Sequence, residues 1–397
     1  MRRLRNDLPY TFRPPRMNLW LRPVILLFNR LCQLRKSYRI SEVVGRGFDR
    51  VAKLQREGHS VILAPNHSDH SDPHVIIEIC ARHELHPHFM GAREIFEVSA
   101  LNCWALQASG VFSVDRDGPD LSAIKTAIGL LEDAERPLVM FPEGEIYHHH
   151  RRIDPLNDGV ASILLKAAKR LKDGKEAYLV PVGMSFFHPP EVEATFNQRL
   201  SKLEDRIGWT PKPKLSVVER VVRLATGVLA LKETEFLGVA CTGEIKDRLT
   251  QLCENLLSDV ESRYPKDGKA TTPPERVRAL RFRIRRRLLD EKTSPSDEER
   301  DVLLDDLDRV FTALQAHSYI GDYVSIDPTT DRTAEMIMKL EEDLFGYPNY
   351  PVDRRAEVMA GEPINVSKLL ADGTLEGKGA AGDLTVMLEE QLQELLS

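Results

Sequence analysis

The chain has 397 residues, of which 42% are hydrophobic and 29% are charged, which is ordinary for a soluble globular protein. The length allows one large domain with an elaboration, or two domains. The five cysteines are odd in number and none forms a CxxC pair, which argues against a disulfide framework or a zinc finger and fits a reducing compartment.

Charge is distributed unevenly along the chain. The formal net charge is -6, but residues 1–60 hold 14 Lys and Arg against 4 Asp and Glu, which leaves -16 on the remainder. Such a basic segment favours an anionic partner surface, either nucleic acid or lipid headgroups. Within it, Met17–Ile40 ("MNLWLRPVILLFNRLCQLRKSYRI") mixes large apolar residues with arginines, which is typical of a membrane-interface segment.

We therefore predict that residues 1–40 form a basic amphipathic segment on a membrane lipid surface, and we expect no nucleic-acid partner. Arg22 and Arg30 interrupt the apolar run, so it is too short to span a bilayer. It also lacks the apolar core and cleavage site of a signal peptide. The alternative interpretation is an N-terminal helix that packs on the rest of the protein.

Short apolar runs then alternate with segments of helical periodicity over residues 41–189, which predicts an α/β domain with a mainly parallel sheet flanked by helices. The predicted strands are Ser60–Asn66, His86–Ala92, Gly110–Arg116, Pro137–Gly144 and Ala177–Phe187. The predicted helices are Asp72–His83, Ala100–Ser109, Asp120–Ala134 and Gly159–Gly174. Trp104 and Phe112 are expected in the core.

Residues 190–350 read differently, because they are charged, helical in period and nearly free of strand-like runs. Clear helices are predicted at Thr242–Tyr264, Pro273–Glu291 and Asp297–His317. The run Arg281–Arg287 is either a solvated basic face or a contact for lipid or an acidic carrier protein. Residues 351–397 read as a strand, a turn and a helix, so we expect them to complete the α/β domain around a helical insertion.

The stretch "NHSDHSDPH" (Asn66–His74) allows three interpretations. A zinc site needs three or four ligands in tetrahedral reach, but the spacing does not match HExxH, so no metal is expected. Ser71 or Asp72 before Pro73 could instead cap the following helix.

The third interpretation is a catalytic dyad. His67 follows a predicted parallel strand, at the edge where α/β sheets place their sites. Asp72 can fold back onto Nδ1 of His67, which fixes the tautomer and leaves Nε2 as a general base. That base could act on a substrate hydroxyl or on water.

Four blocks in order resemble the glycerolipid acyltransferase family, the group of lysophosphatidic acid and glycerol-3-phosphate acyltransferases. The blocks are "NHSDHSD" (Asn66–Asp72, an N-H-x4-D match), "GAREIF" with "ASGVFSVDR" (Gly91–Phe96, Ala108–Arg116), "FPEG" (Phe141–Gly144) and "LVPVGM" (Leu179–Met184). "GEPINV" (Gly361–Val366) resembles the strand and turn that often close the family's domain.

The resemblance implies that His67 deprotonates an acceptor hydroxyl while Asp72 orients it. The hydroxyl would attack an acyl thioester of coenzyme A or acyl carrier protein, which is a co-substrate, so no bound cofactor is expected. Backbone N–H groups near Gly144 would stabilise the oxyanion.

The resemblance also implies substrate-binding roles. Arg116 would hold the acceptor's phosphate, Glu143 would bind the acceptor, and Arg93 belongs to the second block's basic-acidic pair. The expected acceptor is lysophosphatidic acid or glycerol 3-phosphate, in phospholipid biosynthesis. The expected location is cytoplasmic, peripheral on the inner face of the membrane.

One position departs from the family pattern. The third block usually continues E-G-T-R, but here Ile146 stands where the arginine is expected. Arg151, Arg152 or the run His148–His150 could supply the missing charge, and we expect the histidines in a polar loop at the cleft mouth. The alternatives to an acyltransferase are a thioesterase with the same dyad and an inactive membrane-bound scaffold.

Overall fold

The computed structural model describes residues 9–397, apart from 119, 173, 265–269, 291–292 and 322. Residues 1–8 of the predicted membrane segment and Glu291, the predicted end of a helix, therefore lie outside the described residues. The chain divides into two compact units. The sheet unit comprises Phe12–Asp115, Asp120–Pro189 and Tyr350–Ser397, and the helical unit comprises Pro190–Asn349 with the described residues of Met1–Thr11 and Arg116–Pro119.

The sheet unit is built on one eight-stranded sheet with the order β1-β7-β6-β2-β5-β3-β4, in which β8 pairs beside β6. The strands are β1 Ile40–Arg46, β2 Ser60–Pro65, β3 His88–Ala92, β4 Val111–Val114, β5 Leu138–Val139, β6 Ala177–Phe187, β7 Arg354–Ala360 and β8 Ile364–Asn365. Pairing is parallel except where β6 meets β7 and β8. The predicted α/β class with a mainly parallel sheet is confirmed.

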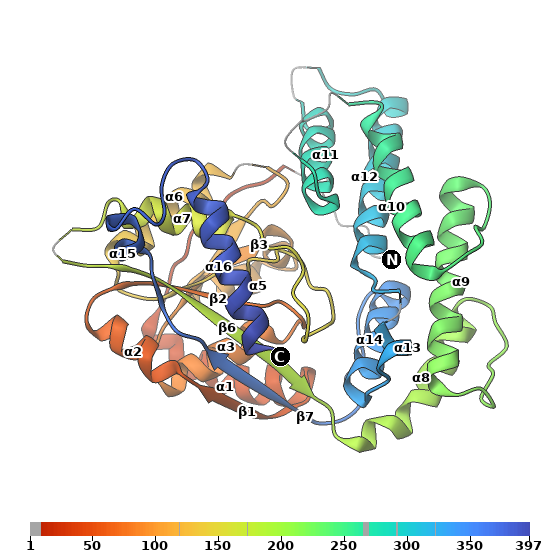
Figure 1. Cartoon of the computed structure of the whole chain (residues 1–397), viewed down its shortest axis with the longest axis horizontal. Helices are drawn as coiled ribbons and strands as arrows, with labels where there is room; N and C mark the ends of the chain where they lie inside the picture. The colour runs from red at the N-terminus through yellow and green to blue at the C-terminus, as the bar shows by residue number, and fades with distance from the viewer. Residues whose placement is uncertain (1–8, 119, 173, 265–269, 291–292, 322) are drawn as a thin grey trace. The chain divides into compact units, whose positions relative to one another are not determined.

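Helices cover both faces of this sheet (Figure 1). They are α1 Arg22–Phe28, α2 Phe48–Arg56, α3 Asp72–Arg82, α4 Arg93–Phe96, α5 Ala100–Ala108, α6 Leu121–Asp133, α7 Gly159–Ala168, α15 Val366–Ala371 and α16 Ala380–Leu395, with a short 3-10 turn at Leu19–Leu21 and a π-helical segment at Asn29–Ser37. On β2, Ile62 joins the core under α6, α7 and α16, while Leu63 joins the core under α2 and α3. Every residue of β2 is buried, as expected for a parallel strand covered on both faces.

The C-terminal segment returns to the sheet unit. β7 pairs in parallel with β1 and antiparallel with β6, where Val182 lies opposite Ala360. The end of α16 packs so closely on β6 that a Cβ at Gly183 would lie 2.8 Å from the Cβ of Leu395. A residue larger than glycine would therefore push this helix away from the strand.

One predicted strand is much shorter than expected. The prediction Pro137–Gly144 is wrong beyond Val139, because β5 ends there and the chain turns at Pro142. Gly144 has φ +78°, which is left-handed backbone that a strand does not contain.

The helical unit contains seven α-helices among its described residues. They are α8 Glu193–Arg206, α9 Val217–Leu237, α10 Ile245–Glu261, α11 Pro273–Leu288, α12 Asp297–Ser318, α13 Tyr323–Ile326 and α14 Thr330–Phe345. Figure 1 shows α10, α11 and α12 side by side, and Leu256, Ile284 and Val310 are buried in one core between them. Within the described part of the chain, no helix is both long and apolar enough to span a bilayer.

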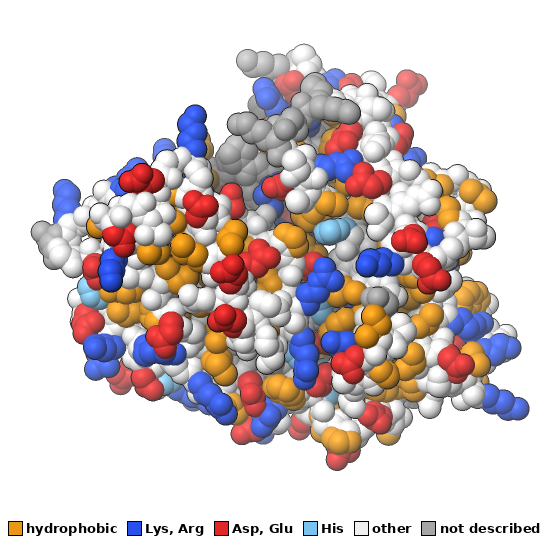
Figure 2. All heavy atoms as spheres, viewed as in Figure 1, with side chains coloured by type: hydrophobic (Ala, Val, Ile, Leu, Met, Phe, Trp, Pro, Cys, Tyr) orange, Lys and Arg blue, Asp and Glu red, His pale blue; other side chains and the backbone are white. Residues whose placement is uncertain are grey.

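Charges are buried as pairs in the helical unit. The ion pair of Arg220 and Glu204 is 2.7 Å long and fully buried. The predicted basic face Arg281–Arg287 is only partly solvated, because Arg281 and Arg285 are buried and lie 2.8 Å and 3.1 Å from the carboxylate of Asp117. Figure 2 shows acidic and basic side chains interspersed over the visible face, with no large field of one sign.

Candidate active site

The loop after β2 is fixed at the carboxyl end of the sheet. Asn66 is buried, its Nδ2 donates to the carbonyl of Met184 at 3.1 Å, and its Oδ1 accepts from the Met184 N–H at 2.7 Å. These two bonds join the end of β2 to β6. They present the next residue, His67, at the edge where parallel sheets bind their substrates.

His67 and Asp72 are in hydrogen-bond contact. Nδ1 of His67 lies 2.9 Å from Oδ2 of Asp72, and Asp72 has no exposed side-chain surface. The same Oδ2 accepts the backbone N–H groups of Ser68 at 2.8 Å and Asp69 at 3.0 Å. Because a carboxylate only accepts, the hydrogen of a neutral His67 ring is on Nδ1, and Nε2 keeps its lone pair.

This contact distinguishes the two interpretations of Asp72, as a cap of the following helix or as a member of a catalytic dyad. A capping residue would accept an N–H from the first turn of α3, but no side-chain cap bond is formed there, and Asp72 reaches back to the loop instead. Burial raises the pKa of Asp72, and the hydrogen bonds from His67 and the Asp69 backbone oppose that rise. The geometry is the one that the dyad interpretation requires.

A buried ion pair holds the other side of this loop. Asp69 accepts two bonds from Arg354 of β7, at 2.8 Å and 2.9 Å, and both side chains are buried. Burial is the largest single influence on Asp69, but the charge and hydrogen bonds of Arg354, with those of Ser71, outweigh it and lower the pKa of Asp69. The guanidinium of Arg354 also lies 4.2 Å from the ring centroid of Tyr350. We did not predict Arg354 from the sequence.

The third block lies directly against His67. The ring of Phe141 stacks on the imidazole with centroids 4.1 Å apart and an interplanar angle of 26°. Oε1 of Glu143 accepts the backbone N–H of His67 at 2.6 Å. Burial, above all, raises the pKa of Glu143 well above its usual value. His67, Asp72 and Glu143 are therefore brought together.

The turn after Glu143 is locked by Asn157. Nδ2 of Asn157 donates to the carbonyls of Pro142 and Glu143, both at 3.0 Å. A Cβ at Gly144 would lie 2.9 Å from that same Nδ2. Gly144 is needed here for its positive φ and for this close approach.

The two predicted arginines lie in different surroundings. Arg93 is 2% exposed, and its Nε and Nη2 donate to one oxygen of Glu97 at 3.0 Å and 2.8 Å, with Asp115 at 3.9 Å. Its guanidinium therefore serves an internal ion pair. Arg116 follows β4 in a segment that groups with the helical unit, so its distance from His67 is left undefined. Their binding roles stay predictions.

The run His148–His150 lies in a loop, as predicted, but its side chains are not exposed at a cleft mouth. His148, His149 and His150 are all buried, whereas Arg151 and Arg152 are exposed. Nδ1 of His149 lies 3.0 Å from the carbonyl of Arg152, and its Nε2 lies 2.9 Å from Oδ2 of Asp154. These local partners allow the histidine to be buried.

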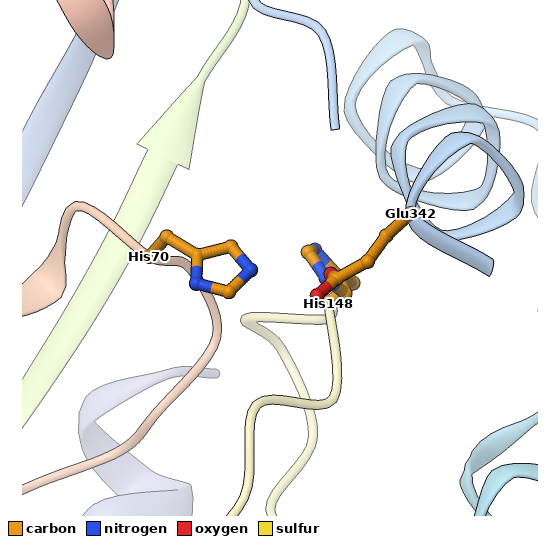
Figure 3. Close-up of side chains that lie close together, drawn as sticks. All are labelled: His70, His148 and Glu342. Carbon is orange, nitrogen blue, oxygen red and sulfur yellow. The ribbon is translucent and has the colours of Figure 1, made fainter. Parts of the chain in front are cut away.

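His70 and His148 face each other from two loops of the sheet unit, with ring centroids 5.8 Å apart (Figure 3). Glu342, which is drawn beside them, belongs to the helical unit, and the positions of the chain's parts relative to one another are not determined. Within the sheet unit this pair offers two imidazoles, fewer ligands than a zinc site takes.

The part of the chain that carries this fold and this site is similar to a known protein family. Residues 47–185 match the family model named Acyltransferase, a range that includes the dyad and the third block. The predicted resemblance to glycerolipid acyltransferases is confirmed. A 1-acyl-sn-glycerol-3-phosphate acyltransferase of Streptococcus pneumoniae is 33% identical over 81 residues, which cover 20% of this chain. The match spans 28% of that protein's length, little more than a quarter of it.

Proposed function

We propose that this protein transfers a fatty acyl group from an acyl thioester, of coenzyme A or acyl carrier protein, to a hydroxyl of a glycerolipid-type acceptor. The observation that carries the proposal is the contact of His67 with the buried Asp72 at the end of β2. It leaves Nε2 of a partly exposed imidazole as the base.

The reaction needs no nucleophile from the protein. Nε2 of His67 accepts the proton as the acceptor oxygen attacks the thioester carbonyl, and Asp72 stabilises the imidazolium that forms. The tetrahedral intermediate then collapses, the C–S bond breaks, and the proton passes from His67 to the departing sulfur. The products are an ester and a free thiol.

The residues around the base support transfer to an alcohol rather than to water. Phe141 covers one face of the imidazole, so water reaches the ring from fewer directions. Burial favours the neutral form of Glu143, which can both donate and accept a hydrogen bond toward a hydroxylated acceptor.

For the acceptor we propose lysophosphatidic acid or glycerol 3-phosphate. The support is the activity for which the Streptococcus pneumoniae protein is named and the place of Arg116 directly after β4 in the second block. Ile146 replaces an arginine of the family's third block, and the exposed Arg151 and Arg152 follow a few residues later. A planar guanidinium suits a phosphate in any of these positions.

We also propose that the sheet unit rests on the inner face of the membrane through an apolar surface. Trp20 on the N-terminal segment is 94% exposed, and Leu101 and Trp104 on α5 are 73% and 55% exposed. The prediction that Trp104 lies in the core is therefore wrong, whereas Phe112 is fully buried as expected. The Asn18 N–H donates to the carbonyl of Ala108 at 2.9 Å, so the N-terminal segment lies against the end of α5. Exposed tryptophans beside arginines suit a lipid interface.

The test is consumption of acyl-CoA by the purified chain, with and without a panel of lysophospholipids, glycerol 3-phosphate and non-phosphorylated acceptors. We expect acceptor-dependent turnover that is lost in His67→Ala and kept in His83→Ala, a histidine outside the site. Turnover without any acceptor would indicate a thioesterase. No turnover with either coenzyme A or acyl carrier protein as carrier would favour an inactive scaffold.

A further inference from the structure

The helical unit holds a partly open apolar cavity of about 290 Å³. Its walls come from α8, α9, α10, α12, α13 and α14, with Val221, Ala225, Leu249, Ala316, Met336 and Leu340 among the residues that line it. An engineered apolar cavity of about 150 Å³ already binds benzene, and small-molecule pockets begin near 300 Å³. The cavity is therefore large enough for part of an aliphatic chain.

The cavity has a fixed wall rather than a loosely closed one. Gly321 lines it, and a Cβ at that position would lie 2.8 Å from the backbone nitrogen of Lys246 at the start of α10. The segment after α12 is thus in backbone contact with α10. A preformed, mostly apolar concavity with a fixed wall is the usual form of a small-molecule site.

The polar groups at one side of the cavity are satisfied by one another. Oδ1 of Asp343 accepts from Nε2 of Gln315 at 2.9 Å, and its Oδ2 accepts from the hydroxyl of Tyr319. Burial raises the pKa of Tyr319, so this phenol keeps its proton and remains the donor. The negative charge of Asp343 is already bound by neutral donors and does not need a cationic ligand.

A positive charge at the same cavity has no carboxylate partner in the part of the chain that the structure describes. Arg206 lines the cavity and is exposed, and its Nε donates to the carbonyl of Leu344 at 3.2 Å, an acceptor without formal charge. Lys232 also lines the cavity but pairs with Glu235 at 2.8 Å. An acidic head group is the complement of Arg206.

We propose that this cavity of the helical unit is a lipid site with residues other than those of the catalytic dyad. It binds one aliphatic chain that ends in an acidic head group. The chain fills the space between α9 and α14, and the head group contacts Arg206. The proposal does not rest on the acyl transfer proposed above, because it concerns residues of the helical unit alone. Both free fatty acids and lysophosphatidic acid have this chemistry.

The test is a fluorescence titration of the purified full chain with cis-parinaric acid, below its micelle concentration and without vesicles. We expect saturable binding to one site, displaced by laurate or by lauroyl lysophosphatidic acid at least tenfold more effectively than by dodecanol. Which of the two acids displaces better identifies the source of the ligand. No saturable binding, or equal displacement by dodecanol, would overturn the proposal.

Substitutions locate the site. Ala225→Phe places a ring in the cavity and should weaken binding at least tenfold, whereas Ala230→Phe on another face of α9 should leave it within twofold. Val222→Phe enters the same space and replaces the first variant if that one fails to fold by circular dichroism. Arg206→Gln should weaken laurate but not dodecanol.

Binding of the probe at the catalytic dyad instead of the cavity would give the opposite pattern. In that case His67→Ala would weaken the binding, and Ala225→Phe would not. This result contradicts the cavity site whether or not the protein is an acyltransferase, so the two proposals fail separately.

Discussion

Replacement of Asp72 by Asn tests the dyad with almost no change of shape. The amide oxygen can still accept the N–H groups of Ser68 and Asp69, but the negative charge 2.9 Å from His67 is lost. Removing one partner of a buried ion pair costs about 3–5 kcal/mol. In the proposed reaction His67 takes up a proton as the transition state is approached, and the carboxylate stabilises the charge that forms, so this cost falls on the barrier. At tenfold per about 1.4 kcal/mol, the turnover of Asp72→Asn should drop roughly 10²- to 10⁴-fold.

The free energy of unfolding of Asp72→Asn should not fall with the turnover; it should rise or stay the same. Because burial raises the pKa of Asp72 in the folded protein, its ionised form costs folding free energy at neutral pH. The cost of ionising Asp72 sets in as pH rises from the usual carboxyl pKa through the raised value. Asparagine does not ionise, so the variant is free of this cost. The free energy of unfolding of Asp72→Asn at pH 7 should therefore equal or exceed that of the wild type.

The assay is thiol release from acyl-CoA at saturating acceptor, combined with urea unfolding of the same samples. The matched control is Asp49→Asn, which removes an exposed carboxylate 3.1 Å from His83 and should change neither quantity. Turnover of Asp72→Asn within threefold of the wild type would refute the role of the carboxylate.

Three other substitutions test the buried ion pair of the loop, the buried acid of the third block and the membrane surface. Arg354→Ala leaves the buried Asp69 without its cation and should lower the free energy of unfolding by about 3–5 kcal/mol in urea, more than Arg355→Ala, its exposed neighbour. Glu143→Gln should flatten the pH dependence of unfolding, because the raised pKa of Glu143 makes the wild type lose stability as pH rises above the usual carboxyl range; an unchanged slope would contradict this. Trp20→Glu should weaken sedimentation with anionic vesicles and leave turnover of a water-soluble acceptor unaffected, and equal sedimentation would argue against the membrane surface.

Most of the α/β fold and the pairing of the dyad could be predicted from local patterns in the sequence. His67 and Asp72 lie five residues apart at the end of a strand of buried apolar residues, so backbone geometry alone limits how they can meet. Strand and helix periods likewise predicted the alternation of the α/β domain, because each element buries a face that its own residues define.

Contacts between distant segments could not be predicted in this way. Arg354 meets Asp69 across 285 positions, and their pairing depends on β7 returning beside β1. Trp104 looked like a core residue because its type is usually buried, but α5 presents it to the outside. The histidines after the third block looked polar, and their burial depends on partners such as Asp154 that the fold supplies.

The most direct test of the central claim is the amount of ester formed for each thiol released. Purified protein is incubated with acyl-CoA and lysophosphatidic acid, and both products are measured in the same sample, by mass spectrometry and by a thiol reagent. An acyltransferase with His67 as its base gives one ester per thiol, and His67→Ala loses both products together. Thiol release without ester, or a ratio that His67→Ala leaves unchanged, would contradict the account.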